Sequence, residues 1–302
     1  MSHEHSNNHY TYTGSFVLGI VLNITFVAIE AGYGFIADSM ALIADAGHNL
    51  SDVMSLILAW GASALAARAA TDKRTYGFRK ATVMASLISG IILLVALGGI
   101  VRESLGRLFH PQSVQGITVI VVAAIGVIIN SLTALLFYKG QKQDLNIRGA
   151  FLHMAADAGV SLGVVIAGVI IIFKEWLWID PLISLVIVCV IFVGTWGLLR
   201  DSMNYALDAV PESVELDEVR SYLLNLDKVD RIHDLHVWPL STSEIALTVH
   251  LVVKENQLDN AFLKTIQQHL HSHFGINHTT VQVEKKGEEV DCLPDYQQCG
   301  KE

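Results

Sequence analysis

The amino-acid sequence predicts a membrane all-α domain of six transmembrane helices, followed by a small cytoplasmic α+β domain. Hydrophobic residues make up 52% of the chain and charged residues only 16%, whereas a typical soluble domain is about 25% charged. The mean hydropathy is +0.46. Charged residues are sparse before residue 200 and dense after it. These observations indicate a membrane-embedded part that precedes a water-exposed part.

Six apolar stretches are each long enough to cross a bilayer as a helix, which takes about 20 residues. Several exceed this minimum, so we expect tilt or extension beyond the bilayer. The first stretch lacks the basic leader and the cleavage site of a secretory signal, so we expect it to remain as a helix. The stretches are Ser15–Phe35, Met40–Ala67, Ala81–Leu105, Gly116–Tyr138, Leu145–Phe173 and Trp178–Leu199.

Basic residues predict the orientation of these helices. They cluster in the connections after the second and fourth helices, whereas the opposite connections hold few. An excess of Lys and Arg marks cytoplasmic loops, so with six spans we expect both termini in the cytoplasm. The clustered residues are Arg68, Lys73, Arg74, Arg79 and Lys80, and then Lys139, Lys142 and Arg148.

The pattern changes at Asp208–Pro211. Beyond it, the periodicity predicts a helix, two strands, a helix and a strand, which together form a small α+β domain. We expect an N-terminal tail over 1–14, a transmembrane domain over 15–207, a cytoplasmic domain over 208–287 and a polar tail over 288–302. The five elements are Val214–Leu226, Arg231–Pro239, Ile245–Val253, Asn260–Phe274 and Thr279–Lys285.

Two of the apolar helices carry the pattern His-x-x-x-Asp, as His48 with Asp52 and as His153 with Asp157. Residues four apart lie on one helix face. An ionisable side chain near the bilayer centre costs about 2.5–3.5 kcal/mol, so these residues must face a partner, water or an ion. If the two faces meet, they offer the nitrogen and oxygen ligands of a divalent metal, which indicates a transport site. A single intramembrane His could instead only hydrogen-bond a neighbouring helix.

Other polar residues in the apolar stretches have several interpretations. Asp45 lies one turn before His48 and could orient a ligand, handle a proton or pack against a helix; we favour the first two. For Glu30 and Asn130 we favour helix packing. Asp72 in the first basic loop is expected to be a solvated charge.

The water-exposed part holds a second set of candidate metal ligands, which combines His, Cys and carboxylate side chains as zinc sites do. His269, His271 and His273 lie on one predicted helix and are expected to face solvent. The N-terminal His3, His5 and His9 either capture metal or are incidental. The candidates are His233 and His236 in RIHDLHVW, His250, Glu284, Cys292 and Cys299.

The three cysteines do not indicate a disulfide framework. Cys189 lies inside the sixth apolar stretch, and Cys292 and Cys299 belong to a tail that we expect in the reducing cytoplasm. A metal-binding or structural role is therefore favoured over a bridge.

Together, the six spans, the two His-x-x-x-Asp pairs, Asp180-Pro181 at the start of the sixth helix and IHDLHVW resemble the cation diffusion facilitator family, close to its zinc-exporting branch. The resemblance covers nearly the whole chain. It implies a homodimer whose cytoplasmic domains have a metallochaperone-like fold, and the exchange of Zn²⁺ for H⁺ by alternating access. It also implies that both His-x-x-x-Asp pairs form the transport site, with His48 associated with zinc preference over cadmium.

The same resemblance matches His233, His250 and Glu284 to regulatory or structural zinc ligands, and Cys292 and Cys299 to tail cysteines of some relatives. His236 is not expected to be a ligand. The sequence departs from many relatives because its connection between the fourth and fifth helices lacks a His-rich loop. Some relatives bind metal after the second helix with an Asp and two His; only Asp72 is present there, so that site is not expected.

Proton exchange also follows from the chemistry of the ligands. Two carboxylates and two neutral imidazoles give bound Zn²⁺ a formal charge near zero, which a low-dielectric interior tolerates. Histidine must be neutral to bind metal, and its unperturbed pKa is about 6.5, so protons compete with metal near physiological pH. If the inward and outward conformations differ in proton affinity, the proton gradient drives export.

Three other classes of protein could use these ligands. A metalloenzyme is disfavoured because the chain has no His-Glu-x-x-His pair, so we expect no enzyme activity. A metal-gated channel and a membrane-anchored metal sensor are alternatives that flux measurements would separate from an exchanger. We expect a multi-pass protein of a bacterial inner membrane. Its expected partners are lipid, divalent metal ions and a second copy, and not nucleic acid.

Overall fold

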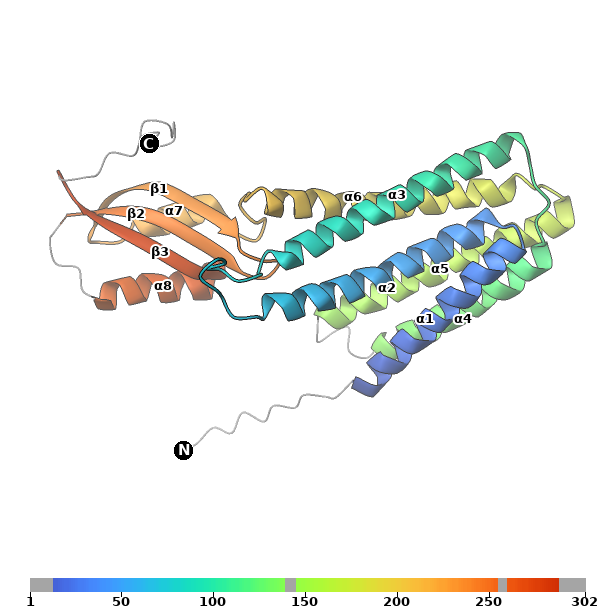
Figure 1. Ribbon diagram of the computed structural model, residues 1–302, viewed down its shortest axis with the longest axis horizontal. Coiled ribbons are helices and arrows are strands. Elements are labelled where there is room, and N and C mark those ends of the chain that lie inside the picture. The colour runs from blue at the N-terminus through green and yellow to red at the C-terminus, as the bar shows by residue number, and fades with distance from the viewer. Residues whose placement is uncertain (1–12, 139–144, 255–259, 288–302) are drawn as a thin grey trace. The chain divides into compact units, whose positions relative to one another are not determined.

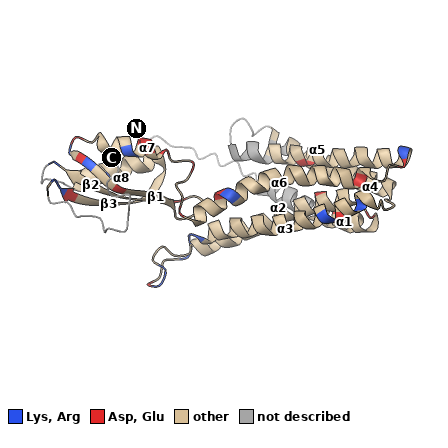
Figure 2. Cartoon of the chain, turned by 90° about the horizontal axis from the view of Figure 1, so that it is seen from above, with Lys and Arg blue, Asp and Glu red and all other residues tan. Residues whose placement is uncertain are grey.

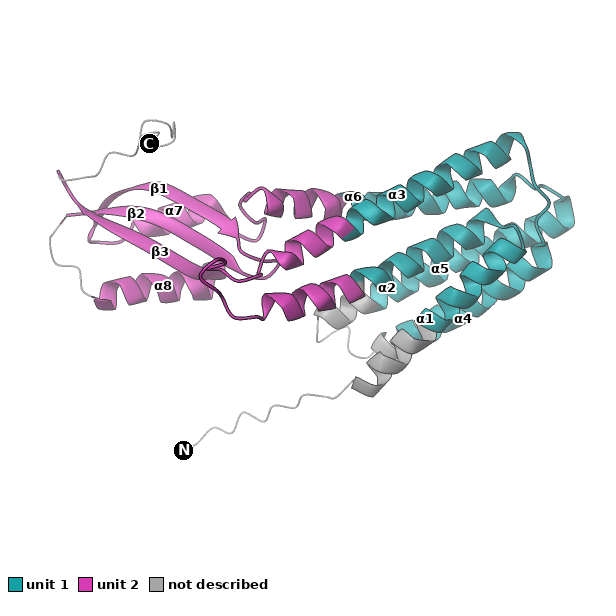
Figure 3. Cartoon of the chain, in the orientation of Figure 1, with its two compact units in different colours: residues 1–56, 89–196 teal, residues 57–88, 197–302 magenta. Residues whose placement is uncertain are grey.

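The computed structural model describes residues 13–138, 145–254 and 260–287 (Figure 1). The chain divides into two compact units (Figure 3). The helix unit comprises residues 1–56 and 89–196, and the second unit comprises residues 57–88 and 197–302.

The first two thirds of the chain form long helices, and each predicted apolar stretch corresponds to one of them. Helices α3 and α6 continue into less apolar sequence beyond the ends predicted at Leu105 and Leu199. The helices are α1 (Thr13–Ile36), α2 (Met40–Ala66), α3 (Ala81–Phe109), α4 (Gly116–Tyr138), α5 (Leu145–Lys174) and α6 (Ile179–Ala206).

Within the described residues, five helices are long and apolar enough to cross a membrane, judged by length and composition. They are α2, α3, most of α4 and α5, and α6, and residues Ile24–Ile36 of α1 form a shorter apolar helix. Lys, Arg, Asp and Glu are sparse along these helices (Figure 2). This arrangement confirms the predicted helical membrane domain.

Helices α4 and α5 approach each other closely because glycines leave room at their contact. A Cβ atom on Gly168 would lie 2.7 Å from Ile120 Cγ1, and a Cβ atom on Gly116 would lie 2.8 Å from Ile172 Cγ1. Both distances are too short for carbon atoms, so the contact requires glycine. Small residues commonly allow such backbone approach in membranes. The contact fixes α5, which carries the second His-x-x-x-Asp pair.

The second unit contains the predicted α+β domain. A three-stranded sheet has β2 at its centre, antiparallel to β1 and parallel to β3. Apolar side chains from the two helices and the sheet form one core, in which Leu223, Leu247, Leu251, Ile266 and Leu270 are fully buried. The elements are α7 (Leu216–Leu224), β1 (Val229–Pro239), β2 (Ile245–Val253), α8 (Asn260–Phe274) and β3 (Ile276–Lys285).

Strand β1 is irregular between His233 and His236, where its register with β2 shifts. Asp234 lies in this segment with φ of 52°, a left-handed conformation that Asp adopts more readily than most residues. Just before the irregularity, His233 pairs with His250 of β2. Glu284 lies on β3, the other neighbour of β2. The sheet therefore brings three predicted ligands to adjacent strands.

Candidate metal sites

The structure brings the two His-x-x-x-Asp pairs of α2 and α5 together. His48 Nε2 lies 3.7 Å from Asp52 Oδ2 and 3.4 Å from Asp157 Oδ1. His153 Nε2 lies 3.1 Å from Asp52 Oδ2 and 3.7 Å from Asp157 Oδ2. Each imidazole therefore approaches the carboxylate of its own helix and that of the other helix. The two rings are 5.9 Å apart and almost perpendicular.

These distances suit a shared metal ion. Ligand atoms about 2.0–2.1 Å from a tetrahedral zinc lie about 3.3 Å from one another, close to the observed nitrogen–oxygen separations. Asp157 is almost fully buried, with 2% of its side chain exposed, whereas His153 is 43% exposed. An ion could therefore enter on the His153 side and meet a buried carboxylate opposite. No group in the described chain donates a hydrogen bond to Asp157 Oδ2.

A second layer of polar residues lies next to these four side chains. Ser161 of α5 donates a hydrogen bond to Asp45 Oδ2 of α2, at 2.8 Å. Asn49 of α2 donates one to Glu30 Oε2 of α1, at 3.3 Å. Asp45 thus links the two helices of the candidate site, consistent with an orienting role. Glu30 is completely buried, and its hydrogen bond from Asn49 joins α1 to α2.

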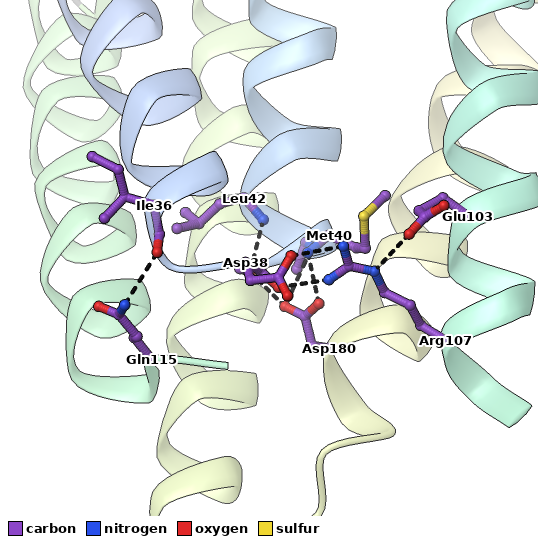
Figure 4. Close-up of polar contacts among 10 residues, drawn as sticks. Ile36, Asp38, Met40, Leu42, Glu103, Arg107, Gln115 and Asp180 are labelled. Carbon is purple, nitrogen blue, oxygen red and sulfur yellow. Dashed lines mark hydrogen bonds and ion pairs between the residues drawn. The ribbon is translucent and has the colours of Figure 1, made fainter. Parts of the chain in front are cut away.

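The beginning of α2 is held by Asp180 at the beginning of α6 (Figure 4). The Asp180 carboxylate accepts hydrogen bonds from the Met40 amide at 2.7 Å, the Ala41 amide at 3.3 Å and the Ser39 hydroxyl at 2.5 Å. Amides in the first turn of a helix have no intrahelical partner, and the helix dipole favours an anion there. Asp180 therefore anchors the helix that carries the first ligand pair.

A neighbouring ion-pair network holds the α1–α2 turn. Arg107 of α3 donates hydrogen bonds of 2.7 Å to both the backbone oxygen and the carboxylate of Asp38, and its Nε donates to Glu103 at 3.0 Å (Figure 4). Asp38 has φ of 56°. Sequence reasoning missed this network; Arg107 lies in the last turn of α3, and Glu103 four residues earlier was the local signal of an ion pair.

The sheet forms the second candidate site from His233, His250 and Glu284. Their ligand atoms all lie within 4.8 Å of one another. Glu284 Oε2 lies 3.1 Å from His233 Nε2, and Glu284 Oε1 lies 2.8 Å from His250 Nδ1. Only 3% of the Glu284 side chain is exposed. Two imidazoles facing a buried carboxylate form a set of zinc-type ligands.

Asp234 is a further acidic residue beside this set, and sequence reasoning missed it. Its carboxylate lies 2.9 Å from His236 Nε2 and 3.5 Å from His250 Nε2. His236 is 44% exposed and contacts Asp234 instead of joining the three candidate ligands. The left-handed conformation of Asp234 was not visible in the sequence pattern.

Other residues that the sequence analysis considered occur outside these two sets. Cys292, Cys299, His3, His5 and His9 lie outside the described residues. Cys189 is exposed on α6.

His271 and His273 are exposed as expected, whereas His269 is half-buried because it stacks on Tyr222 with ring centroids 3.9 Å apart. Burial and the neighbouring His273 lower the pKa of His269. A lower pKa keeps this ring neutral to more acidic pH. Asp72 is exposed, as predicted for a solvated loop charge.

Long apolar helices with converging His and Asp side chains, joined to a small α+β domain, define a membrane transporter of metal cations. Comparison with known protein families identifies the family of this transporter. The cation efflux transmembrane domain matches residues 16–205, and the cation efflux protein cytoplasmic domain matches residues 211–286. The chain belongs to the cation efflux family, which confirms the resemblance inferred from the sequence. It is therefore a metal exporter.

Several relatives are similar over nearly their whole length. The metal cation efflux system protein CzcD of Cupriavidus metallidurans is 34% identical over 285 residues, which are 94% of this chain and 89% of the relative. The cadmium, cobalt and zinc/H(+)-K(+) antiporter of Bacillus subtilis is 31% identical over 293 residues, 95% and 94% of the two chains. The zinc transporter ZitB of Escherichia coli is 31% identical over 290 residues, 94% and 92%.

Among solved structures, the metal-bound C-terminal domain of the CzcD transporter from Cupriavidus metallidurans is 36% identical to this chain. The match covers 24% of this chain and 99% of the solved domain, with a TM-score of 0.22.

Proposed function

We propose that this protein exports Zn²⁺ from the cytoplasm in exchange for protons by alternating access. The transport site consists of His48, Asp52, His153 and Asp157. The observation that carries this proposal is the convergence of two imidazoles and two carboxylates from α2 and α5, with nitrogen–oxygen separations of 3.1–3.7 Å. Imidazole and carboxylate ligands suit zinc, and their combined charge offsets that of the ion.

The names of the relatives support the choice of ions. ZitB of Escherichia coli is named a zinc transporter, and the Bacillus subtilis relative is named an antiporter of cadmium, cobalt and zinc against protons and potassium. Protons and metal compete for the same imidazole nitrogens. A pH gradient across the membrane can therefore drive zinc against its own gradient.

The cytoplasmic domain contributes a separate zinc site in this proposal. His233, His250 and Glu284 provide its ligands, and Cys292 and Cys299 of the tail complete it. This site regulates or stabilises the domain and does not carry the transported ion. The domain also joins two copies of the chain into a homodimer, in keeping with the match to the cytoplasmic domain of the family.

The proposed topology follows from the basic loops. Six helices span a bacterial inner membrane, both termini lie in the cytoplasm, and the boundaries are those of residues 15–207 and 208–287. The protein acts as a transporter and not as an enzyme, in keeping with relatives that are named an antiporter and a transporter.

The central test compares zinc uptake by the parent and by Asp157→Ala in proteoliposomes with an acidic interior, where protons leave as zinc enters. We expect the variant to lose at least tenfold of the initial rate, because removing a ligand or its orienting group costs roughly 10–100-fold in metal affinity. Asp72→Ala, which removes an exposed loop carboxylate, should transport like the parent. Undiminished uptake by Asp157→Ala would refute the proposed transport site.

A further inference from the structure

A buried carboxyl pair lies beside the proposed transport site and outside its set of ligands. Glu30 of α1 and Asp45 of α2 are both completely buried. Asp45 precedes His48 by three residues, so it lies about one helical turn away. Ser161 of α5 and Asn49 of α2 surround the pair and are also buried. The helix unit therefore encloses two acidic groups that the metal ligands do not require.

In the described part of the chain, each carboxyl group of this pair receives a hydrogen bond at one of its two oxygens only. Ser161 donates to Asp45 Oδ2 and Asn49 donates to Glu30 Oε2. The remaining oxygens, Glu30 Oε1 and Asp45 Oδ1, receive no hydrogen bond from any donor in the described part of the chain. Asn49, which holds Glu30, lies four residues after Asp45 on the same face of α2, so the two carboxyl groups lie on the same side of this helix. Two carboxylates can share a hydrogen bond only when one of them carries a proton.

Electrostatics also indicates that the pair holds a proton. Burying an unpaired ion costs several kcal/mol, and two close carboxylates share a proton instead of both ionising. The charged groups that act on the pair are Asp157 of α5, which repels a second negative charge, and His48 of α2. Helix α4 contains no Asp, Glu, His, Lys or Arg. No fixed cation among these groups neutralises both carboxylates.

We propose that Glu30 and Asp45 together hold a proton that is exchanged for the transported metal, at a site distinct from the metal ligands. This inference rests on the proposed metal–proton exchange. When Zn²⁺ binds next to Asp157 and His48, its positive charge favours ionisation of the pair, so an O–H bond breaks and the proton passes to water. When the metal leaves, the pair takes up a proton again. No other reactant is needed.

An isosteric variant separates proton exchange from packing. In Glu30→Gln, the amide can still donate a hydrogen bond to Asp45 and fills the same volume, but it carries no proton that metal binding could release. Asp45→Asn is the complementary change. Glu103→Gln is the matched control, because Glu103 is a carboxylate of the same unit that is 55% exposed and pairs with Arg107.

The test measures protons released per zinc bound. Purified full-length protein in detergent is titrated with Zn²⁺ by calorimetry in two buffers of different ionisation enthalpy. We expect each isosteric variant to bind as many zinc ions as the parent but to release about one proton fewer per transport-site ion. The Glu103→Gln control should release as many protons as the parent. Melting temperatures show whether each variant folds. If one isosteric variant fails to fold, the proton release of the other variant tests the inference.

The outcomes are distinguishable. Parental proton release in a folded variant with parental zinc binding would overturn the inference and leave the proposed transport function intact. Zinc binding that depends on K⁺ and not on pH would assign the pair to a monovalent cation and would also overturn it. If Asp157→Ala binds as much zinc as the parent, the transport site itself is wrong, and the proton site fails with it.

Discussion

At the scale of single residues, both candidate metal sites share one feature, a nearly fully buried carboxylate between two imidazoles. Asp157 has 2% of its side chain exposed and Glu284 has 3%. A buried carboxylate is costly unless it is paired, so the folded chain already favours a cationic partner at each position. The imidazoles contribute neutral nitrogen ligands that protonation removes. Each site is therefore suited to a divalent ion and sensitive to pH.

Glu284→Gln should remove the zinc-dependent stabilisation of the cytoplasmic domain, because an amide is a poor replacement for a carboxylate ligand. At a free zinc concentration 100 times the Kd of the site, binding stabilises the folded state by about 2.7 kcal/mol. Thermal unfolding with and without Zn²⁺ measures this gain, in an Asp157→Ala background so that the transport site does not contribute. Glu218→Gln, an exposed carboxylate on α7, is the control. Equal stabilisation of both variants by zinc would contradict the cytoplasmic site.

At the scale of elements, the position of α2 decides where the first ligand pair lies. Asp180 accepts the first amides of α2, and Arg107 holds the preceding turn through Asp38. These contacts join α2 to α6 and α3 at the end opposite the basic loop that follows α2. The proposed metal ligands and the residues that position their helix are thus separate groups.

Asp180→Ala should destabilise the protein by about 2 kcal/mol, because it leaves buried amides at the beginning of α2 without an acceptor. Detergent-solubilised protein, unfolded by heat, would show a lower Tm than the parent. The change Glu103→Ala alters an exposed ion pair of the same network and should cost no more than about 1 kcal/mol. Equal melting temperatures for Asp180→Ala and the parent would show that this cap does not anchor α2.

The sequence predicted the elements better than their contacts. Hydrophobic windows indicated α1 to α6 because burial in lipid requires long apolar runs. The pairing of α2 with α5 was expected only because both carry His-x-x-x-Asp. The contacts of Asp180 with Met40 and of Arg107 with Asp38 join residues more than 60 positions apart, which no local pattern reveals. The irregularity in β1 also escaped prediction, because the backbone conformation of Asp234 leaves no periodic signal.

At the scale of the whole molecule, membership of the cation efflux family and the geometry of α2 and α5 support the proposed exchanger. A channel would also need ligands, but its flux would follow the metal gradient alone. An exchanger couples two gradients, so the direction of metal movement depends on the pH on both sides. The proton competes at imidazoles whose ordinary pKa of about 6.5 lies within the physiological range.

Reversal of the pH gradient should therefore reverse net zinc movement in proteoliposomes. With equal zinc on both sides, an acidic interior should drive accumulation and an acidic exterior should drive loss, and an ionophore that collapses the gradient should abolish both. A fluorescent zinc indicator inside the vesicles measures the direction. Flux that is identical under the two gradients would support a channel and reject the exchanger.

The glycine contact between α4 and α5 limits the motions open to such an exchanger. Ile120 of α4 packs against Gly168 of α5, and Ile172 of α5 packs against Gly116 of α4, so each helix has an isoleucine seated at a glycine of the other. Sliding or rotation at this seam would force atoms into overlap, so the two helices are expected to travel as one rigid body. The switch between sides must then be made at other helix contacts, with α4 carrying His153 and Asp157 of α5 along as it moves.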